Sequence, residues 1–415
     1  MLSLLNNYRR YQHNYHYGLI LLLAFSRVVT SNVLSCPPDF DCNAYLQMVD
    51  NWLYQPQIAG HHAMRILPPI IVKLFTLLGI SKVHGFYLLS SFTYCAFGAL
   101  VYYFFKTHNV YPQQMVFRVG AECSKRRSVY EIHDCGESHE GNTTENSSVK
   151  GINPQLALCL SLLCLAPHAA MRIPLQLVYQ SCDMIVYPLV LLIFMYSLRQ
   201  NALAVFALGL SGLLVRQNLF VMSLFSLLFC WTKKRELLTL GYAALTVGCY
   251  LLLQNYFQAN ETFRQLLSPP EGYFTVNHLA WVFWDSKLLE LLVPALPLIL
   301  WHIKPLIQWF WRNWHLSAYM CITIGQPFLA YHMTGNNFPR LALQGFWPIY
   351  LALGCVYLSK LQNKRLLGIL FIYALSIYFT WGIEQRIYMA GLLTVILLSE
   401  QLWRWSVSRM VGARI

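Results

Sequence analysis

Residues 66–80 read ILPPIIVKLFTLLGI, and the route of this short segment decides the topology of the whole chain. As an α-helix it would reach about 22 Å, which is short of the roughly 30 Å of a bilayer's hydrocarbon core. The paired prolines Pro68 and Pro69 fix where a helix begins, and Lys73 interrupts the apolar run. We therefore expect 66–80 to be an interfacial helix that does not cross the membrane.

The composition of the chain is that of a membrane protein. Its 415 residues are 57% hydrophobic and only 11% charged, against roughly 25% charged in an ordinary soluble protein. We predict one all-α integral membrane domain over 1–415, a bundle of about 12 transmembrane helices with the first retained as a signal anchor. The predicted spans are 17–32, 84–106, 152–168, 180–198, 202–215, 218–232, 237–257, 288–303, 316–333, 341–359, 366–380 and 386–403.

The distribution of Lys and Arg supports this route for 66–80. With both termini cytoplasmic and 66–80 not crossing, about two thirds of the 30 basic residues fall on the cytoplasmic side. If 66–80 crosses, fewer than a third remain there, against the positive-inside rule. Residues 33–83 are then a first external loop containing the interfacial helix. The basic excess between apolar segments also explains the net charge of +13 without nucleic acid.

The polar stretch 107–150 is predicted to be a disordered insertion. Its Lys and Arg content favours the cytoplasmic side, whereas two sequons at Asn142 and Asn146 and the pair Cys123 and Cys135 are typical of an external loop. We expect the cytoplasmic side. Cysteine spacing shows no zinc pattern, although two cysteines of the first loop, Cys36 and Cys42, can form a disulfide if that loop faces an oxidising compartment. Three tryptophans fit a cytoplasmic interfacial belt: Trp309, Trp311 and Trp314.

Polar residues of the predicted external segments gather close to helix ends, where they can line one cavity. Ionisable residues at membrane depth are costly and usually mark a pathway or a site. Asp183 lies one turn inside an apolar segment and needs a partner, for which Arg172 and Arg216 are the choices. The candidate site residues are Asp41, His61, His62, Arg65, Arg172, Asp183, Arg216 and Arg340.

Five stretches resemble the GT-C superfamily of polytopic glycosyltransferases: DFDCNAYL and HHAMRILPP in the first loop, then VYQSCDMIVYPLVLL, LGLSGLLVRQNLF and GNNFPRLALQGFWPIY. The resemblance implies a GT-C-like fold and transfer of a sugar from a polyprenyl- or dolichyl-phosphate donor to a lipid, glycan or protein acceptor. It places the chain in a bacterial inner membrane or the endoplasmic reticulum, with the site on the non-cytoplasmic face. The chain lacks the Asp-Asp or Asp-Glu pair that many members carry, so neither the base nor a metal is fixed.

Such a transfer needs a carboxylate base and cations that stabilise the departing phosphate. We expect Asp41 to be the base, although it can equally cap a loop helix. Phosphate contacts are expected from Arg65, Arg172, Arg216 and Arg340, and the two histidines can bind phosphate or sugar. A divalent cation is permitted but not required. The alternatives are a transporter or flippase for a lipid-linked or anionic substrate, which uses the same arginines, and a non-catalytic scaffold subunit.

Overall fold

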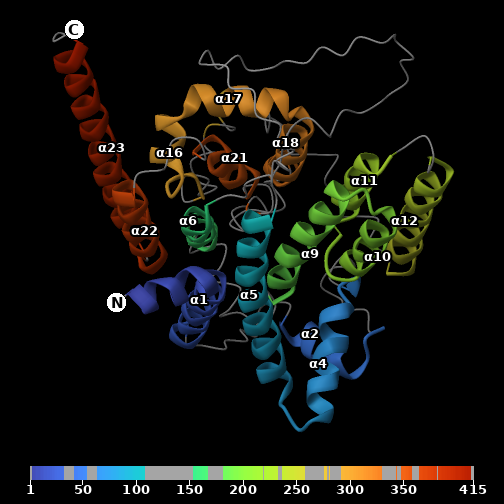
Figure 1. Cartoon of the computed structure of the whole chain (residues 1–415). Helices are drawn as coiled ribbons and strands as arrows, with labels where there is room; N and C mark the ends of the chain where they lie inside the picture. Colours follow the sequence, from blue (N-terminus) through green and yellow to red (C-terminus); the bar gives the residue numbers. More distant parts are fainter. Residues whose placement is uncertain are drawn as a thin grey trace, which may run out of the picture.

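The computed structural model of this chain describes residues 2–31, 42–53, 63–107, 153–166, 181–217, 219–231, 236–257, 275–277, 280, 291–329, 343, 347–357, 364–380 and 382–412. Across these ranges the regular structure is entirely helical, with 15 helices and no strand (Figure 1). The prediction of an all-α chain is therefore confirmed.

Helix α5 (Lys82–Thr107) is the axis around which the N-terminal half is arranged. Helix α1 (Leu2–Thr30) packs against it in the opposite direction, because Tyr102 near the end of α5 meets His16, while Tyr87 near its start meets Val28. Helix α1 begins well before the predicted span 17–32. At 1.5 Å per residue α5 is about 39 Å long, so it exceeds the hydrocarbon thickness.

Helix α2 (Cys42–Asp50), helix α4 (Leu67–Leu77) and the first turns of α5 form one end of the molecule, at the bottom of Figure 1. Two prolines open α4, and Gly79, with φ of +82°, ends the turn that follows it. This left-handed conformation suits glycine. The chain then reverses into α5, and a Cβ on Gly85 would lie 2.8 Å from Val72. The segment 66–80 is thus a short helix folded back along α5.

Helices α9 (Ser181–Leu198), α10 (Ala202–Leu213), α11 (Leu219–Phe229) and α12 (Glu236–Tyr256) follow one another as antiparallel neighbours. The side chain of Asn201 accepts a hydrogen bond from the backbone N–H of Ala204 (3.1 Å) and so caps α10. Helices α10 and α11 are separate, as predicted, and Arg216 lies in the turn between them.

Small residues let α10 and α11 approach closely. A Cβ on Gly209 would lie 2.6 Å from Ser223 Oγ and 2.8 Å from its Cβ. We expect Gly209→Leu to lower the free energy of unfolding by about 1–3 kcal/mol, the usual cost of overpacking. Gly241→Leu on α12 is the matched control, since its Cβ would meet nothing within 4 Å. Thermal unfolding of the full chain checks this; equal midpoints for the two variants would contradict the close approach.

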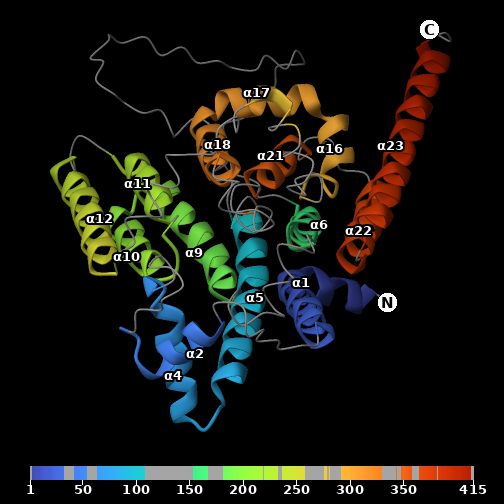
Figure 2. The same ribbon diagram turned by 180° about the vertical axis from the view of Figure 1, so that it is seen from behind.

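The remaining helices are α6 (Pro154–Leu165), α16 (Leu296–Trp301), α17 (Ile303–Arg312), α18 (Trp314–Leu329), α21 (Trp347–Tyr357), α22 (Lys364–Phe379) and α23 (Ile383–Gly412). Figures 1 and 2 show α17 lying across the helices beside it, perpendicular to the vertical axis of both views. The prediction of a continuous helix over 288–303 is wrong. The chain turns at 293–295, because Pro294 and Pro297 cannot extend a helix through that point.

Two of the described helices, α5 and α12, are long and apolar enough to cross a membrane, as judged by length and composition alone. Large apolar side chains are exposed along helices at the periphery of the molecule. On α12 they include Leu237 and Leu252, and on α23 Val395 and Leu402. Soluble monomers rarely expose contiguous apolar patches larger than a few hundred Å².

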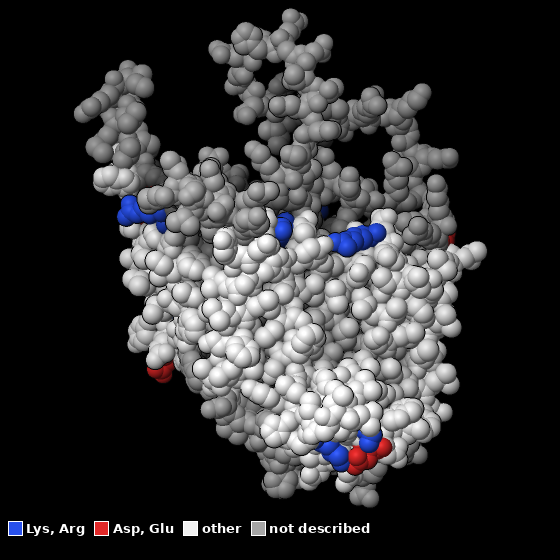
Figure 3. Space-filling view, turned by 60° about the horizontal axis from the view of Figure 1, so that its bottom comes forward, with Lys and Arg blue, Asp and Glu red and all other residues white. Residues whose placement is uncertain are grey.

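Charged side chains are confined largely to the two ends of the described part. On the face seen in Figure 3, basic groups and one acidic group at the right edge mark the upper rim, and a mixed basic and acidic cluster lies at the lower end. The broad surface between them carries one acidic group, at its left edge. The mixed cluster contains Asp50, Lys73 and Lys82. The exposed basic residues described outside it are Arg199, Lys304, Arg312 and Arg365, and Lys106 is half-buried.

Candidate functional site

The first loop meets the turn between α10 and α11 at the lower end of the α9–α12 group. The backbone N–H of Leu67 donates to the carbonyl of Leu214 (3.0 Å). Three residues after Leu214, the side-chain amide of Gln217 lies 2.8 Å from the sulfur of Met64. Residues 64–67 and 214–217 are therefore in direct contact, although they are far apart in the sequence.

A buried ion pair occupies this junction. Asp183, in the first turn of α9, is 4% exposed and pairs with the guanidinium of Arg216, whose side chain is 13% exposed. The carboxylate is also favoured by its place at a helix N-terminus. Of the two predicted partners for Asp183, the structure thus provides Arg216. Removing one member of a buried pair leaves a buried charge, at a cost of about 3–5 kcal/mol.

Arg65 stands on the adjoining segment and joins it to the first-loop helix α2. Its Nη1 donates to the hydroxyl of Tyr45 at 2.9 Å. Tyr45 is buried in the first turn of α2 and packs edge-on against Phe86 of α5, with ring centroids 6.4 Å apart. The start of α2 is therefore held beside the segment that contacts the α10–α11 turn.

Three of the eight predicted site residues are within the described part, and the structure brings them to this one junction: Arg65, Asp183 and Arg216. The other five fall outside the described residues: Asp41, His61, His62, Arg172 and Arg340. Asp41 immediately precedes α2 in the sequence, four residues before the tyrosine that binds Arg65. In the described part, no group of three His, Cys, Asp or Glu side chains is placed to hold a metal ion.

Cys42, the first residue of α2, is disulfide-bonded, whereas seven other described cysteines are free thiols. Cys36, the partner predicted for it if the loop faces an oxidising compartment, lies outside the described residues. Disulfides persist in oxidising compartments and are rare in the cytosol. A disulfide at this position is compatible with the predicted external first loop.

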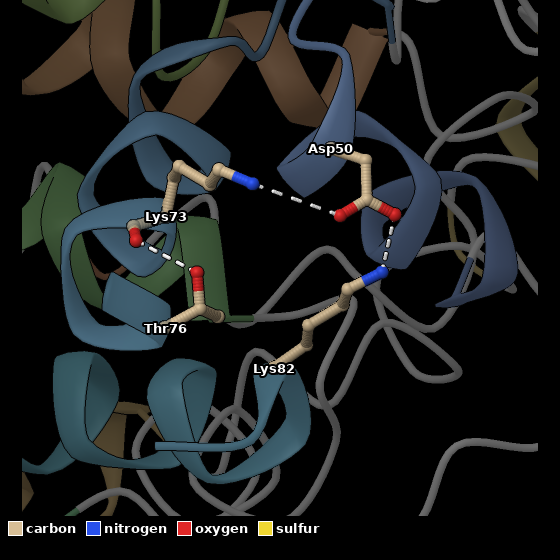
Figure 4. Close-up of polar contacts among 4 residues, drawn as sticks. All are labelled: Asp50, Lys73, Thr76 and Lys82. Atoms are coloured by element: carbon tan, nitrogen blue, oxygen red, sulfur yellow. Dashed lines mark hydrogen bonds and ion pairs between the residues drawn. The ribbon is translucent and has the colours of Figure 1, made fainter. Parts of the chain in front are cut away.

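A second ionic cluster lies at the outer edge of the same lobe. Asp50, at the end of α2, accepts a 2.5 Å hydrogen bond from Lys82 and lies 3.9 Å from Lys73 Nζ (Figure 4). Thr76 on α4 donates to the carbonyl of Lys73 (2.7 Å). The cluster ties the ends of α2 and α4 to the start of α5. Its side chains are well exposed, so it is a modest tether.

This cluster predicts a pH dependence of stability. The hydrogen bond from Lys82 lowers the pKa of Asp50 below its usual value. A carboxyl group whose folded-state pKa is depressed stabilises the fold at neutral pH, and this is lost as pH falls through the folded-state pKa. We therefore expect Asp50→Asn to lower the thermal midpoint at pH near 7 but not well below pH of about 4. A difference that persists in acid would contradict the ion pair.

Two buried arginines outside the set of predicted site residues join distant helices. Arg27 of α1 donates to the carbonyls of Leu165 (2.7 Å) and Tyr378 (2.6 Å), which lie in the last turns of α6 and α22. Its guanidinium also lies 4.3 Å from the centre of the Tyr378 ring. The sequence already contained a signal for this role, because Arg27 is a lone ionisable residue inside the apolar segment 17–32 and such residues need partners.

Arg386 of α23 has the same role at the same two helix ends. Its Nη2 donates to the carbonyls of Ala166 (2.8 Å) and Thr380 (2.9 Å), and its side chain is fully buried. Cations at helix C-termini satisfy terminal carbonyls and complement the helix dipole. Both arginines are therefore built into the fold, and their guanidinium groups are engaged by the backbone.

The junction has a different chemistry. It combines two half-buried arginines, Arg65 and Arg216, with the buried carboxylate of Asp183 and the hydroxyl of Tyr45. Arginine forks match phosphate oxygens. Comparison with protein-family models, with curated proteins and with solved structures finds no match. Functional inference therefore rests on this geometry and on the sequence.

Proposed function

We propose that this chain is a multi-pass membrane glycosyltransferase that uses a sugar carried on a polyprenyl or dolichyl phosphate, with its site at the junction of the first loop and the α10–α11 turn. The observation that carries the proposal is the Asp183–Arg216 ion pair, because the residues on either side of Arg216 in the sequence, Leu214 and Gln217, contact the segment that bears Arg65. Burying charged groups at this junction is costly. Binding of an anionic substrate would account for the presence of these charges.

Membrane location is supported by the apolar exterior of α12 and α23 and by the broad surface with little charge in Figure 3. The shorter helices complete the bundle of about 12 spans in this proposal. Helices α6 and α9 are surrounded by other helices, so they need not cover the full lipid thickness themselves. The Cys42 disulfide favours an external position for the α2–α4 end, and the basic groups of the other end favour the cytoplasm.

The proposed chemistry assigns the described residues to the donor. Arg65 binds the phosphate, and Arg216, fixed by Asp183, adds positive potential behind it. The acceptor hydroxyl attacks the anomeric carbon, the bond from that carbon to the phosphate oxygen breaks, and the phosphate leaves with the electron pair. The acceptor proton passes to a carboxylate, for which Asp41 remains the expected base.

The test uses the full chain in proteoliposomes with a panel of polyprenyl-phosphate-linked hexoses. Losing one donor to a developing charge typically costs about 100- to 1000-fold in rate, so we expect Arg65→Gln to lose at least that much and Arg65→Lys somewhat less. Arg199→Gln is the control, because Arg199 is exposed at the end of α9 away from the junction. Full activity of Arg65→Gln would contradict the site.

The same preparation separates the alternative functions. Movement of intact donor across the vesicle membrane without cleavage of the sugar–phosphate bond would assign the junction to transport. An Asp41→Asn variant that folds and supports wild-type transfer would remove Asp41 as the base. If no hexose donor is cleaved or moved, and Asp41→Asn functions normally in cells, the chain is a scaffold subunit.

A further inference from the structure

Helix α17 presents three different surfaces around its short length. Leu306 and Asn313 are buried, with Trp309 and Phe310 half-buried beside them. The Asn313 side chain donates to the carbonyl of Trp309 (2.7 Å) and fixes the corner with α18. This side of the helix therefore faces the protein.

A second stripe is apolar and exposed. Ile303, Ile307 and Trp311 recur every four residues, which places them along one side of a helix. Their exposed fractions are 49%, 61% and 84%. Trp314, at the start of α18, is 60% exposed and follows the same stripe. An apolar stripe of this kind is favoured at a lipid surface and disfavoured in water.

The third stripe is basic and polar. Lys304, Gln308 and Arg312 are exposed and also recur every four residues, each one position after a member of the apolar stripe. The whole stretch 291–329 contains no Asp or Glu. One side of α17 therefore packs against the protein, a second is suited to hydrocarbon, and a third is suited to a polar environment that contains anions. A helix at the surface of a bilayer with anionic headgroups meets these three environments.

We propose that α17 lies in the plane of the membrane surface as a binding site for anionic phospholipid, with the apolar stripe among the acyl chains and Lys304 and Arg312 against headgroup phosphates. The horizontal course of α17 in Figures 1 and 2 agrees with this placement. The inference rests on the membrane location given above and not on the glycosyltransferase activity. The partner is the lipid leaflet itself.

The first test places a bimane fluorophore on the full chain in phosphatidylcholine bilayers that contain nitroxide-labelled lipid, in a background with the exposed Cys321 replaced by serine. Cysteines are introduced at Ile307, at Gln308 and, as a control, at Leu252 on the exposed side of α12. We expect strong quenching at 307 and 252 and several-fold weaker quenching at 308. Quenching at 252 without quenching at 307 would overturn the proposal alone. Quenching at neither would overturn membrane location itself.

The second test concerns the lipid charge. With the nitroxide carried on phosphatidylserine at the same mole fraction, quenching at 307 should report a local enrichment of about fivefold for each basic residue. The Lys304→Gln/Arg312→Gln variant should return quenching to the phosphatidylcholine level. Lys73→Gln/Lys82→Gln, which removes the same charge at the opposite end, should leave the enrichment intact. Equal enrichment in both double variants would refute the headgroup contacts.

Discussion

Replacing Arg27 with methionine should cost about 3–5 kcal/mol of stability, a large share of the 5–15 kcal/mol that holds most folds. Methionine fills much of the same volume but donates no hydrogen bond. The carbonyls of Leu165 and Tyr378 then lose charge-assisted hydrogen bonds of about 1.5–3 kcal/mol each in a buried setting. The stability of Arg27→Lys should lie between those of the wild type and of Arg27→Met, because an ammonium group cannot reproduce the guanidinium fork that reaches both helix ends.

A buried ion pair can be replaced by apolar residues without loss of stability, but only when both of its members are replaced. The two shortest hydrogen bonds of Arg27 go to backbone carbonyls, which no substitution removes. The measurement is the thermal midpoint of the solubilised full chain. Arg199→Met serves as control because Arg199 is exposed, and its hydrogen bond to Tyr103 is long, at 3.5 Å. A midpoint for Arg27→Met within a degree or two of that control would show that the helix ends do not depend on Arg27.

The second large effect is expected at the junction. Asp183→Asn removes the carboxylate that faces Arg216 and keeps its size, so the guanidinium stays buried without its counter-charge. The expected loss is about 3–5 kcal/mol. The double variant Asp183→Leu/Arg216→Met removes both charges and should recover most of that stability, because it leaves no buried ion.

This double variant separates the structural from the functional role of the pair. If the pair serves substrate binding, Asp183→Leu/Arg216→Met should be nearly as stable as the wild type and yet inactive with lipid-phosphate donors. A stable and fully active double variant would contradict the assigned role. Failure of the double variant to recover stability would show instead that the pair is required for packing.

Much of the helix layout could be predicted from local sequence. Helix α4 is bounded by its opening prolines and by Gly79, and α10 by the Asn201 cap, all of which are short-range signals. The separation of α10 from α11 followed from a single charged residue, Arg216, between two apolar runs. Such features need no knowledge of tertiary contacts.

Other features depend on contacts that local pattern does not contain. Arg27 reaches carbonyls 138 and 351 residues away, so its role as a double helix cap requires the folded arrangement. The three tryptophans of 309–314 were predicted to share one interfacial belt. The structure divides them, with Trp309 half-buried and Trp311 and Trp314 exposed, because four-residue spacing and not composition decides which side of a helix a residue occupies.

The pairing of Asp183 with Arg216 shows the same limit for the site. The sequence offered two arginines as partners, and the pairing with Arg216 depends on the packing of the α10–α11 turn against α9. The break of the predicted helix 288–303, by contrast, could have been found, since Pro294 and Pro297 lie inside it. The segment 288–303 was predicted to be a single span because of its apolar composition, in spite of these two prolines.

The most direct test of the account is the side of the membrane on which each end of the molecule lies. Single cysteines at Ser81, in the turn between α4 and α5, and at Gln308 on α17 are both exposed positions. An impermeant thiol reagent applied to intact cells should label the cysteine at 81, and should label that at 308 only after permeabilisation. Labelling of both from the same side would contradict the proposed topology.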